Sequence, residues 1–135
     1  MIKVLCIDDD AITLMLCTTT IKKSGLSSEI ITLLNGQEGV DYYNKLTSTI
    51  GYENHSFYPD LIFLDLNMPI LNGWEFLDYF MEDHYPKLQK TKVVILSSTV
   101  DPRDKEKAKQ YPIVIDFFSK PITNEMLSKL SYKLN

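Results

Sequence analysis

The sequence predicts an α/β protein with a doubly wound fold, in which helices cover both faces of one five-stranded parallel β-sheet. Short apolar runs alternate with segments of helical periodicity five times along the 135 residues. Strands that alternate with helices in this way form parallel sheets. Several of the runs are apolar at nearly every position, which is typical of strands covered on both faces.

The first strand and helix are predicted near the N-terminus. Residues 2–7 form a β-branched apolar run that stops at acids, which predicts a buried strand. A helix over 11–24 follows, with Gly25 in the position of a helix C-cap glycine. The apolar residues at helical spacing are Ile12, Met15, Leu16 and, further along, Ile21.

A second strand is expected at 29–34, followed by another helix. Asn35 and Glu38 have the Asn-x-x-Glu spacing of a capped helix start. The apolar face of this helix consists of Val40, Tyr43 and Leu46. The segment 47–58 is polar and contains a glycine, so it is expected to be a loop.

The third strand is expected at 61–64, where every residue is apolar. Asn72 and Glu75 repeat the capped helix start. The inward stripe of that helix is Trp74, Leu77, Phe80 and Met81. Another run, at 91–96, predicts the fourth strand.

The final helices are marked by their first residues. Asp101 is an N-cap, and Pro102 occupies the first helical position. A fifth strand is expected at 113–118. Thr123 caps the last helix, and the two residues in hydrophobic-staple positions around it are Ile122 and Leu127.

Composition and charge exclude several classes of protein. The chain has 18 acidic and 14 basic residues and a net charge of −4, which argues against electrostatic binding to nucleic acid or anionic membranes. No apolar run approaches the ~20 residues of a membrane span, and acids come too early for a signal peptide. We therefore expect a single cytoplasmic domain over residues 1–135. Its buried thiols would be Cys6 and Cys17, and its surface histidines His55 and His84.

Polar side chains are predicted at the carboxyl ends of four of the five strands. In chain order they are Asp8, Asp9, Asp65, Ser97 and Lys120. The carboxyl ends of parallel strands share one edge of the sheet, where ligands bind in open α/β folds. The second strand offers only Asn35 at this edge.

Three carboxylates that converge on one point repel one another and raise each other's pKa. A hard divalent cation removes this repulsion, and magnesium binds a few carboxylates while it keeps several waters. Asp9 and Asp65 are candidates for direct ligands, and Asp8 is a candidate for holding a metal-bound water. A backbone carbonyl near Asn67 would complete the ligands from the protein.

The same edge of the sheet suits a phosphoryl group. Lys120 and the hydroxyl of Ser97 can each meet an oxygen of the incoming group, and one carboxylate must then attack phosphorus. Asp65 is the best candidate for the nucleophile, because its strand is central in the predicted sheet.

These motifs resemble those of the response-regulator receiver domains, the CheY-like family, over essentially the whole chain. The matching stretches are Leu5–Asp9, Leu61–Pro69, Gly73, Val94–Ser98 and Ser119–Pro121. The resemblance implies a flavodoxin-like sheet with strand order 2-1-3-4-5.

The resemblance also implies roles for individual residues. Asp65 would be the phosphoacceptor, and Lys120, joined to Pro121 by a cis peptide bond, would bind the phosphoryl group. Ser97 and Phe117 would be the switch residues. The metal, Mg²⁺ or Mn²⁺, would be held by Asp8, Asp9, Asp65 and the backbone carbonyl of Asn67.

By this resemblance the chain would be a stand-alone response regulator, a signalling protein rather than an enzyme. A sensor histidine kinase or a histidine phosphotransfer protein would donate the phosphoryl group. A downstream protein would bind the face formed by the helix after Asp101, the strand at 113–118 and the last helix. Contact residues there would be Arg103, Lys105 and Tyr111. The protein would be a monomer or a weak phosphorylation-dependent dimer, and would bind neither nucleic acid nor membranes.

Three other functions fit these residues less well than a response regulator does, and a fourth fits them equally well. A magnesium-dependent phosphohydrolase would carry its nucleophile in an Asp-x-Asp-x-Thr motif after the first strand, and residues 8–12 do not fit that motif. A flavin carrier of flavodoxin type would need hydroxyls there, because acids repel the flavin phosphate. A pseudo-receiver typically lacks one of the acids or the lysine. A phosphorelay intermediate without its own output fits the sequence as well as a regulator does.

Overall fold

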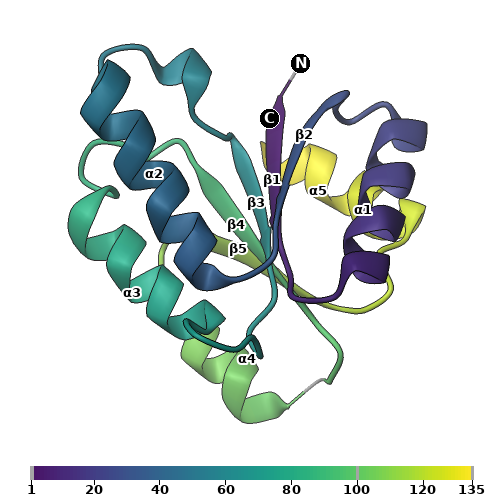
Figure 1. Cartoon of the computed structure of the whole chain (residues 1–135). Helices are drawn as coiled ribbons and strands as arrows, with labels where there is room; N and C mark the ends of the chain where they lie inside the picture. The colour runs from purple at the N-terminus through teal and green to yellow at the C-terminus, as the bar shows by residue number, and fades with distance from the viewer. Residues whose placement is uncertain (1, 100, 135) are drawn as a thin grey trace.

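The computed structural model describes residues 2–99 and 101–134, so both ends of the expected domain range lie outside it. Its five parallel strands have the order β2-β1-β3-β4-β5 (Figure 1), which confirms the predicted fold class. The strands are β1 (Lys3–Ile7), β2 (Glu29–Leu33), β3 (Leu61–Leu64), β4 (Lys92–Ser97) and β5 (Val114–Ser119). The helices are α1 (Ala11–Ser24), α2 (Gly36–Ile50), α3 (Gly73–Asp83), α4 (Pro102–Ala108) and α5 (Asn124–Leu134), with a short 3₁₀ helix η1 (His55–Phe57).

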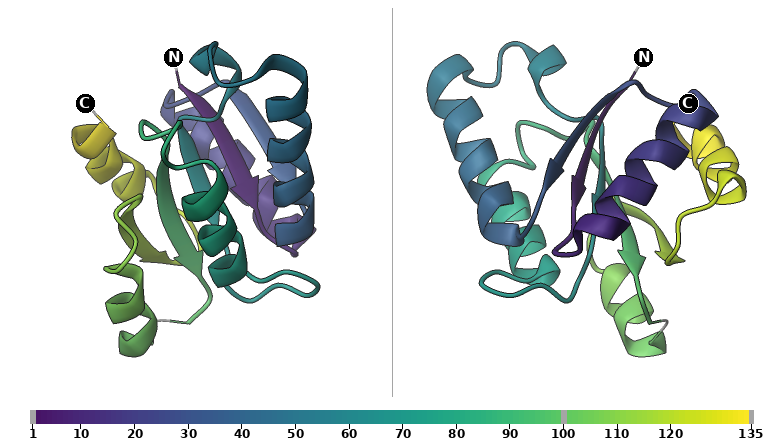
Figure 2. Two further views of the ribbon diagram at one scale, coloured as in Figure 1. Left: turned by 90° about the vertical axis from the view of Figure 1, so that its left-hand side faces the viewer. Right: turned by 45° about the vertical axis from the view of Figure 1, so that its right-hand side comes forward.

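Helices cover both faces of the sheet, with α2 and α3 on one face and α1 and α5 on the other (Figures 1 and 2). Successive residues of a strand point to opposite faces, so β1 contributes to two apolar cores. Leu5 and Ile7 belong to the core under α2 and α3. Val4 and Cys6 belong to the core under α1 and α5. This burial on both faces explains why the central strands have no polar alternation.

Side-chain caps begin three helices close to the carboxyl edge of the sheet. Asp10 accepts a hydrogen bond from a backbone N–H of α1 at 2.9 Å, and Asn35 accepts one from the backbone N–H of Glu38 at 2.9 Å. Asn72 and Glu75 form a complete capping box. Each cap satisfies free N–H groups of the first helical turn and so fixes where the helix begins. Helices α1 and α2 begin a few residues after the preceding strand, whereas α3 begins only after the loop at 65–72.

The apolar spacing of α1 does not mark its buried face. Leu14, Cys17 and Ile21 face the core. Of the predicted residues only Ile21 is therefore buried, and the other three are exposed: Ile12 is 64%, Met15 60% and Leu16 47% exposed. The helix has apolar residues on both sides, and only the side toward the sheet and α5 is covered. Periodicity alone cannot distinguish two apolar faces of one helix.

The expected loop at 47–58 is partly helical, so this prediction is wrong at its start. Helix α2 continues to Ile50, and the N–H of Gly51 bonds to the carbonyl of Thr47 at 3.1 Å. Leu46 and Ile50 lie one turn apart and both pack against the core, which extends the helix through a polar stretch. The segment beyond it holds η1 and a buried Tyr58.

His84 is buried rather than at the surface, which corrects the expectation from sequence. The residue is 3% exposed, and the hydroxyls of Tyr52 and Tyr79 lie 2.6 and 2.5 Å from the two ring nitrogens. Burial lowers the pKa of His84. The histidine therefore joins the end of α3 to the segment that follows α2.

The buried face of α3 is wider than the predicted stripe. Leu77 and Phe80 are fully buried, as expected, whereas Trp74 and Met81 are half-buried. Phe76, which the stripe omitted, is also fully buried. Helix α3 contacts both the sheet and α2, so residues on two adjacent sides of it are covered.

None of the helices in residues 2–99 and 101–134 is both long enough and apolar enough to cross a bilayer.

Candidate functional site

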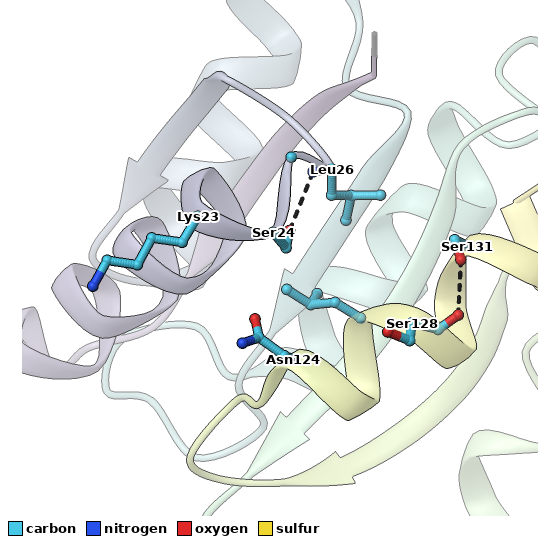
Figure 3. Close-up of a pocket in the computed structure, with 8 residues that line it drawn as sticks. Lys23, Ser24, Leu26, Asn124, Ser128 and Ser131 are labelled. Carbon is cyan, nitrogen blue, oxygen red and sulfur yellow. Dashed lines mark hydrogen bonds between the residues drawn. The ribbon is translucent and has the colours of Figure 1, made fainter.

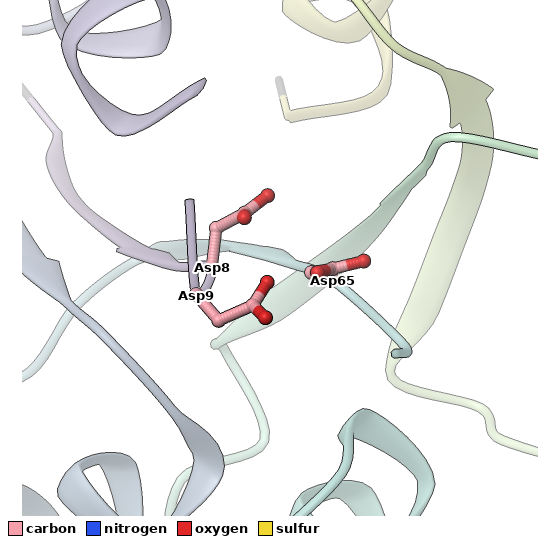
Figure 4. Close-up of side chains that lie close together, drawn as sticks. All are labelled: Asp8, Asp9 and Asp65. Carbon is pink, nitrogen blue, oxygen red and sulfur yellow. The ribbon is translucent and has the colours of Figure 1, made fainter. Parts of the chain in front are cut away.

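Three carboxylates meet at the carboxyl edge of the sheet (Figure 4). Asp8 and Asp9 follow β1, and Asp65 follows β3, which is paired with β1 in the sheet. One oxygen from each carboxylate lies within 4.8 Å of those of the other two. Asp8 and Asp65 are buried and Asp9 is exposed, so the cluster opens to solvent on the side of Asp9.

The backbone holds the two buried acids in place. The N–H of Asp65 continues the sheet by bonding to the carbonyl of Ile7 at 3.0 Å, and the N–H of Asp8 bonds to the carbonyl of Leu33 at 3.1 Å. Gly73 packs against the backbone of Asp65 so closely that a β-carbon there would collide with its carbonyl oxygen. This contact explains why a glycine begins α3.

Lys120 supplies the positive charge of the site. Its Nζ lies 2.6 Å from Oδ2 of Asp8 and 3.6 Å from Oδ2 of Asp65. The backbone N–H of Lys120 donates to the carbonyl of Ser97 at 2.7 Å, and the bond to Pro121 is cis, as expected. Burial alone would lower the pKa of Lys120, but the two carboxylates raise it above its usual value, so the ammonium stays charged.

The surroundings of Asp65 raise the pKa of its carboxyl group. Its pKa rises from 3.8 to about 6, first because the carboxyl is buried and second because Asp8 is close. Lys120 and the backbone N–H of Asn67, which lies 3.4 Å from Oδ1 of Asp65, act in the opposite direction. Neutralising the carboxylates with further positive charge would therefore be favourable.

Ser97 ends β4 at the same edge and is fully buried. Its Oγ accepts a hydrogen bond from the N–H of Thr99 at 3.3 Å. The geometry thus places the hydroxyl on the strand next to that of Asp65, in contact with the loop that leads to α4. The structure records its bond to this loop, and no direct bond to Asp65 among the described residues.

The two remaining predicted site residues differ in their contacts, since of the two only Asn67 has a hydrogen bond to the cluster among the described residues. Asn67 is exposed and contacts Asp65 through its backbone N–H. Phe117 is half-buried on β5, where it packs against the core under α2 and α3.

One residue that supports the site was missed from sequence. The N–H of Gly36, at the start of α2, donates to the carbonyl of Leu71 at 3.1 Å and so ties the loop after Asp65 to α2. A β-carbon at Gly36 would clash with that same residue. The available signal was a glycine directly after a helix cap, where only the cap itself was interpreted.

The donor set of the cluster fits a hard divalent cation. Three carboxylates within reach of one another offer only oxygen ligands, and their repulsion is relieved by a doubly charged ion. A hollow of about 480 Å³ between α1 and α5 lacks such a set of oxygen ligands (Figure 3). None of the residues that line this hollow carries a carboxylate, and Ser24 and Ser131 already bond to neighbouring backbone. The acidic cluster is therefore the candidate site.

Comparison with solved structures identifies close relatives of this fold. A two-component response regulator from Cytophaga hutchinsonii is 36% identical, with 98% of this chain and 95% of that chain covered and a TM-score of 0.86. The chemotaxis protein CheY4 of Vibrio cholerae shares the fold at 24% identity, with 100% and 99% covered and a TM-score of 0.75.

Comparison of sequences agrees with the structural relatives. A protein-glutamate methylesterase/protein-glutamine glutaminase of Archaeoglobus fulgidus is 35% identical over 121 residues, which are 88% of this chain and 30% of that protein. The chain thus spans less than a third of the length of this relative. The family model of the response regulator receiver domain matches residues 4–131. The chain therefore belongs to the response regulator receiver domain family of two-component signalling.

Proposed function

We propose that Asp65 is the phosphoacceptor of this receiver domain and takes a phosphoryl group from a phosphohistidine. The observation that carries the proposal is the contact of one lysine with two buried acids, Asp8 and Asp65, on adjacent strands. An Oδ of Asp65 would attack phosphorus as the P–N bond of the donor breaks. The electron pair of that bond leaves with the imidazole, which takes up a proton.

The charges around Asp65 have separate roles in this proposal. A bound Mg²⁺ or Mn²⁺ would neutralise the acids and the phosphoryl oxygens, and would be held by Asp8, Asp9, Asp65 and the backbone carbonyl of Asn67. Lys120 already lies close to Asp65 and can move its ammonium from Asp8 to a phosphoryl oxygen. Asp8 then remains free to face the metal.

Ser97 and Phe117 would convert phosphorylation into a change of surface. A phosphoryl group on Asp65 accepts a hydrogen bond from the Ser97 hydroxyl, which draws Ser97 away from the N–H of Thr99. The loop before α4 then loses an anchor, and Phe117 on β5 can repack. The face formed by α4, β5 and α5 would change its affinity for a downstream protein, with Arg103, Lys105 and Tyr111 as contacts.

The test is phosphorylation by a small donor, read by the intact mass of the protein. Acetyl phosphate with Mg²⁺ should add one phosphoryl group to the wild type, and none with EDTA present. Asp65→Asn should stay unmodified, whereas the matched control Asp10→Asn, which keeps a competent N-cap, should be modified as the wild type is. Wild-type uptake in Asp65→Asn would overturn the assignment.

The phosphohydrolase alternative is not favoured. The candidate nucleophile follows β3 rather than β1, and the family is one of signalling domains. A role as a phosphorelay intermediate differs from a regulator only in the fate of the phosphoryl group. Transfer from phosphorylated protein to a histidine phosphotransfer protein would distinguish the two.

A further inference from the structure

The loop between β3 and α3, residues 65–72, contains an unusual backbone turn. Ile70 has φ +70°, the one positive φ outside glycine among the described residues. The N–H of Leu71 donates to the carbonyl of Pro69 at 2.9 Å, which closes a three-residue turn around Ile70. A three-residue turn with positive φ at its centre is the rare and strained form of the γ-turn.

This turn is costly for isoleucine. A β-carbon crowds the backbone when φ is positive, and β-branching makes the crowding worse, so glycine or asparagine is the usual residue. The loop is fixed on both sides of the turn, because Leu71 accepts from Gly36 and Leu66 accepts from Gly73. The surrounding structure therefore imposes a conformation that Ile70 would not choose by itself.

The side chain of Ile70 gives no stability in return. It is 78% exposed, so it adds little to the core. Strained residues that persist without internal packing are concentrated at functional sites. Ile70 lies on the loop that begins at Asp65 and leaves the carboxyl edge of the sheet, so it shares this edge with the candidate site.

Other exposed apolar side chains occur at the same edge of the sheet. Leu34 directly follows β2, and Ile12 is the second residue of α1, which begins after the acids of β1. Met15 and Leu16 continue the exposed apolar face along α1. A small phosphate ester is polar and gains nothing from such groups, whereas a protein that covers the edge would bury them.

We propose that Ile70 is a specificity-determining contact for a protein phosphodonor. The donor would present its phosphohistidine from a surface with apolar side chains around it, and Ile70 would pack against that surface while phosphorus reaches Asp65. The inference rests on the proposed function of Asp65, and it assigns to the strained turn the discrimination between protein and small-molecule donors.

The experiment compares two kinds of donor on the same variants. Phosphoramidate is the small donor. The protein donors are the phosphorylated histidine kinases and phosphotransfer proteins of the organism that encodes this chain, and each is tested separately. The variants are Ile70→Asn, which suits a positive φ but removes the apolar group, and Ile70→Leu, which keeps it. Tyr132→Asn is the matched control, because Tyr132 is 85% exposed on α5.

Phosphorylation by phosphoramidate should stay within about twofold of the wild type in all variants. The rate from the fastest protein donor should fall at least about fivefold in Ile70→Asn, since burial of an isoleucine side chain favours binding by about tenfold or more. It should stay within about twofold in Ile70→Leu and Tyr132→Asn. The melting temperature of Ile70→Asn should be equal to or above that of the wild type, because the strain is relieved.

An unchanged rate from the protein donor in Ile70→Asn would overturn the inference. Equal losses from both donors would also overturn it, because Ile70 would then act on the chemistry. The inference would also be overturned if no protein donor phosphorylated the wild type faster than phosphoramidate does. Failure of phosphoramidate to modify wild-type Asp65 would instead count against the proposed function, so the two failures are distinguishable.

Discussion

Replacing Asp65 with asparagine is expected to stabilise the metal-free protein above neutral pH. The pKa of Asp65 rises from its ordinary value of 3.8 to about 6 in the fold, because the carboxyl is buried and faces Asp8. The folded state thus binds the proton more tightly than the unfolded chain does. The contribution of Asp65 to the free energy of unfolding is therefore greatest below about pH 4, falls as pH rises from about 4 to about 6, and is level above that range.

The magnitude follows from the size of the shift. A shift of about 2 units at about 1.4 kcal/mol per unit sets an upper limit of about 3 kcal/mol. Water reaches the cluster on the side of Asp9, and the resulting screening reduces the expected gain to about 1–2 kcal/mol. Asparagine keeps the size of the side chain and removes the charge, so the gain should appear only where Asp65 is ionised.

Urea unfolding in EDTA, from about pH 5 to about pH 8, measures this effect. The wild type should lose stability with rising pH relative to Asp65→Asn, and Asp10→Asn should follow the wild type because its carboxylate is exposed. If Asp65→Asn were no more stable than the wild type at about pH 8, the repulsion argument would be refuted. Added Mg²⁺ should stabilise the wild type far more than Asp65→Asn.

Three further changes test other contacts of the site and the core. Lys120→Met leaves Asp8 and Asp65 without a buried cation, so the free energy of unfolding at about pH 8 should fall by roughly 3 kcal/mol, and by less at about pH 5; urea midpoints at both pH values measure it. Gly73→Ala forces a methyl group against the Asp65 carbonyl and should cost about 1–3 kcal/mol and slow phosphorylation by acetyl phosphate; equal uptake rates would contradict the packing argument. His84→Phe removes the shared partner of two tyrosine hydroxyls, which keep contacts with the Asp83 carbonyl and with Asn44, so it should cost about 1 kcal/mol in thermal unfolding, against no change if the ring only fills space.

The convergence of the candidate site residues was predictable because parallel topology converts sequence position into spatial position. Each apolar run ends at the same edge, so Asp8, Asp65 and Lys120 had to converge once the runs were recognised as strands. The contact of Lys120 with Asp8, which is shorter than that with Asp65, depends on side-chain geometry. No spacing in the sequence indicates it.

The errors share a different cause, which is tertiary context. Helix α1 has apolar residues on two faces, and packing against α5 decides that Leu14 rather than Met15 is buried. His84 is buried because tyrosines distant in sequence, such as Tyr52, surround it. The strained turn at Ile70 is set by hydrogen bonds to neighbouring elements, so the local sequence carries no sign of it.

The most direct test of the proposed phosphoacceptor is to locate the phosphoryl group on the chain. Protein treated with acetyl phosphate and Mg²⁺ is reduced with borohydride, which converts an aspartyl phosphate to homoserine, and the peptides are sequenced by mass spectrometry. We predict homoserine at position 65 and unmodified Asp8 and Asp9. Homoserine at either of those two acids, with Asp65 intact, would contradict the proposal.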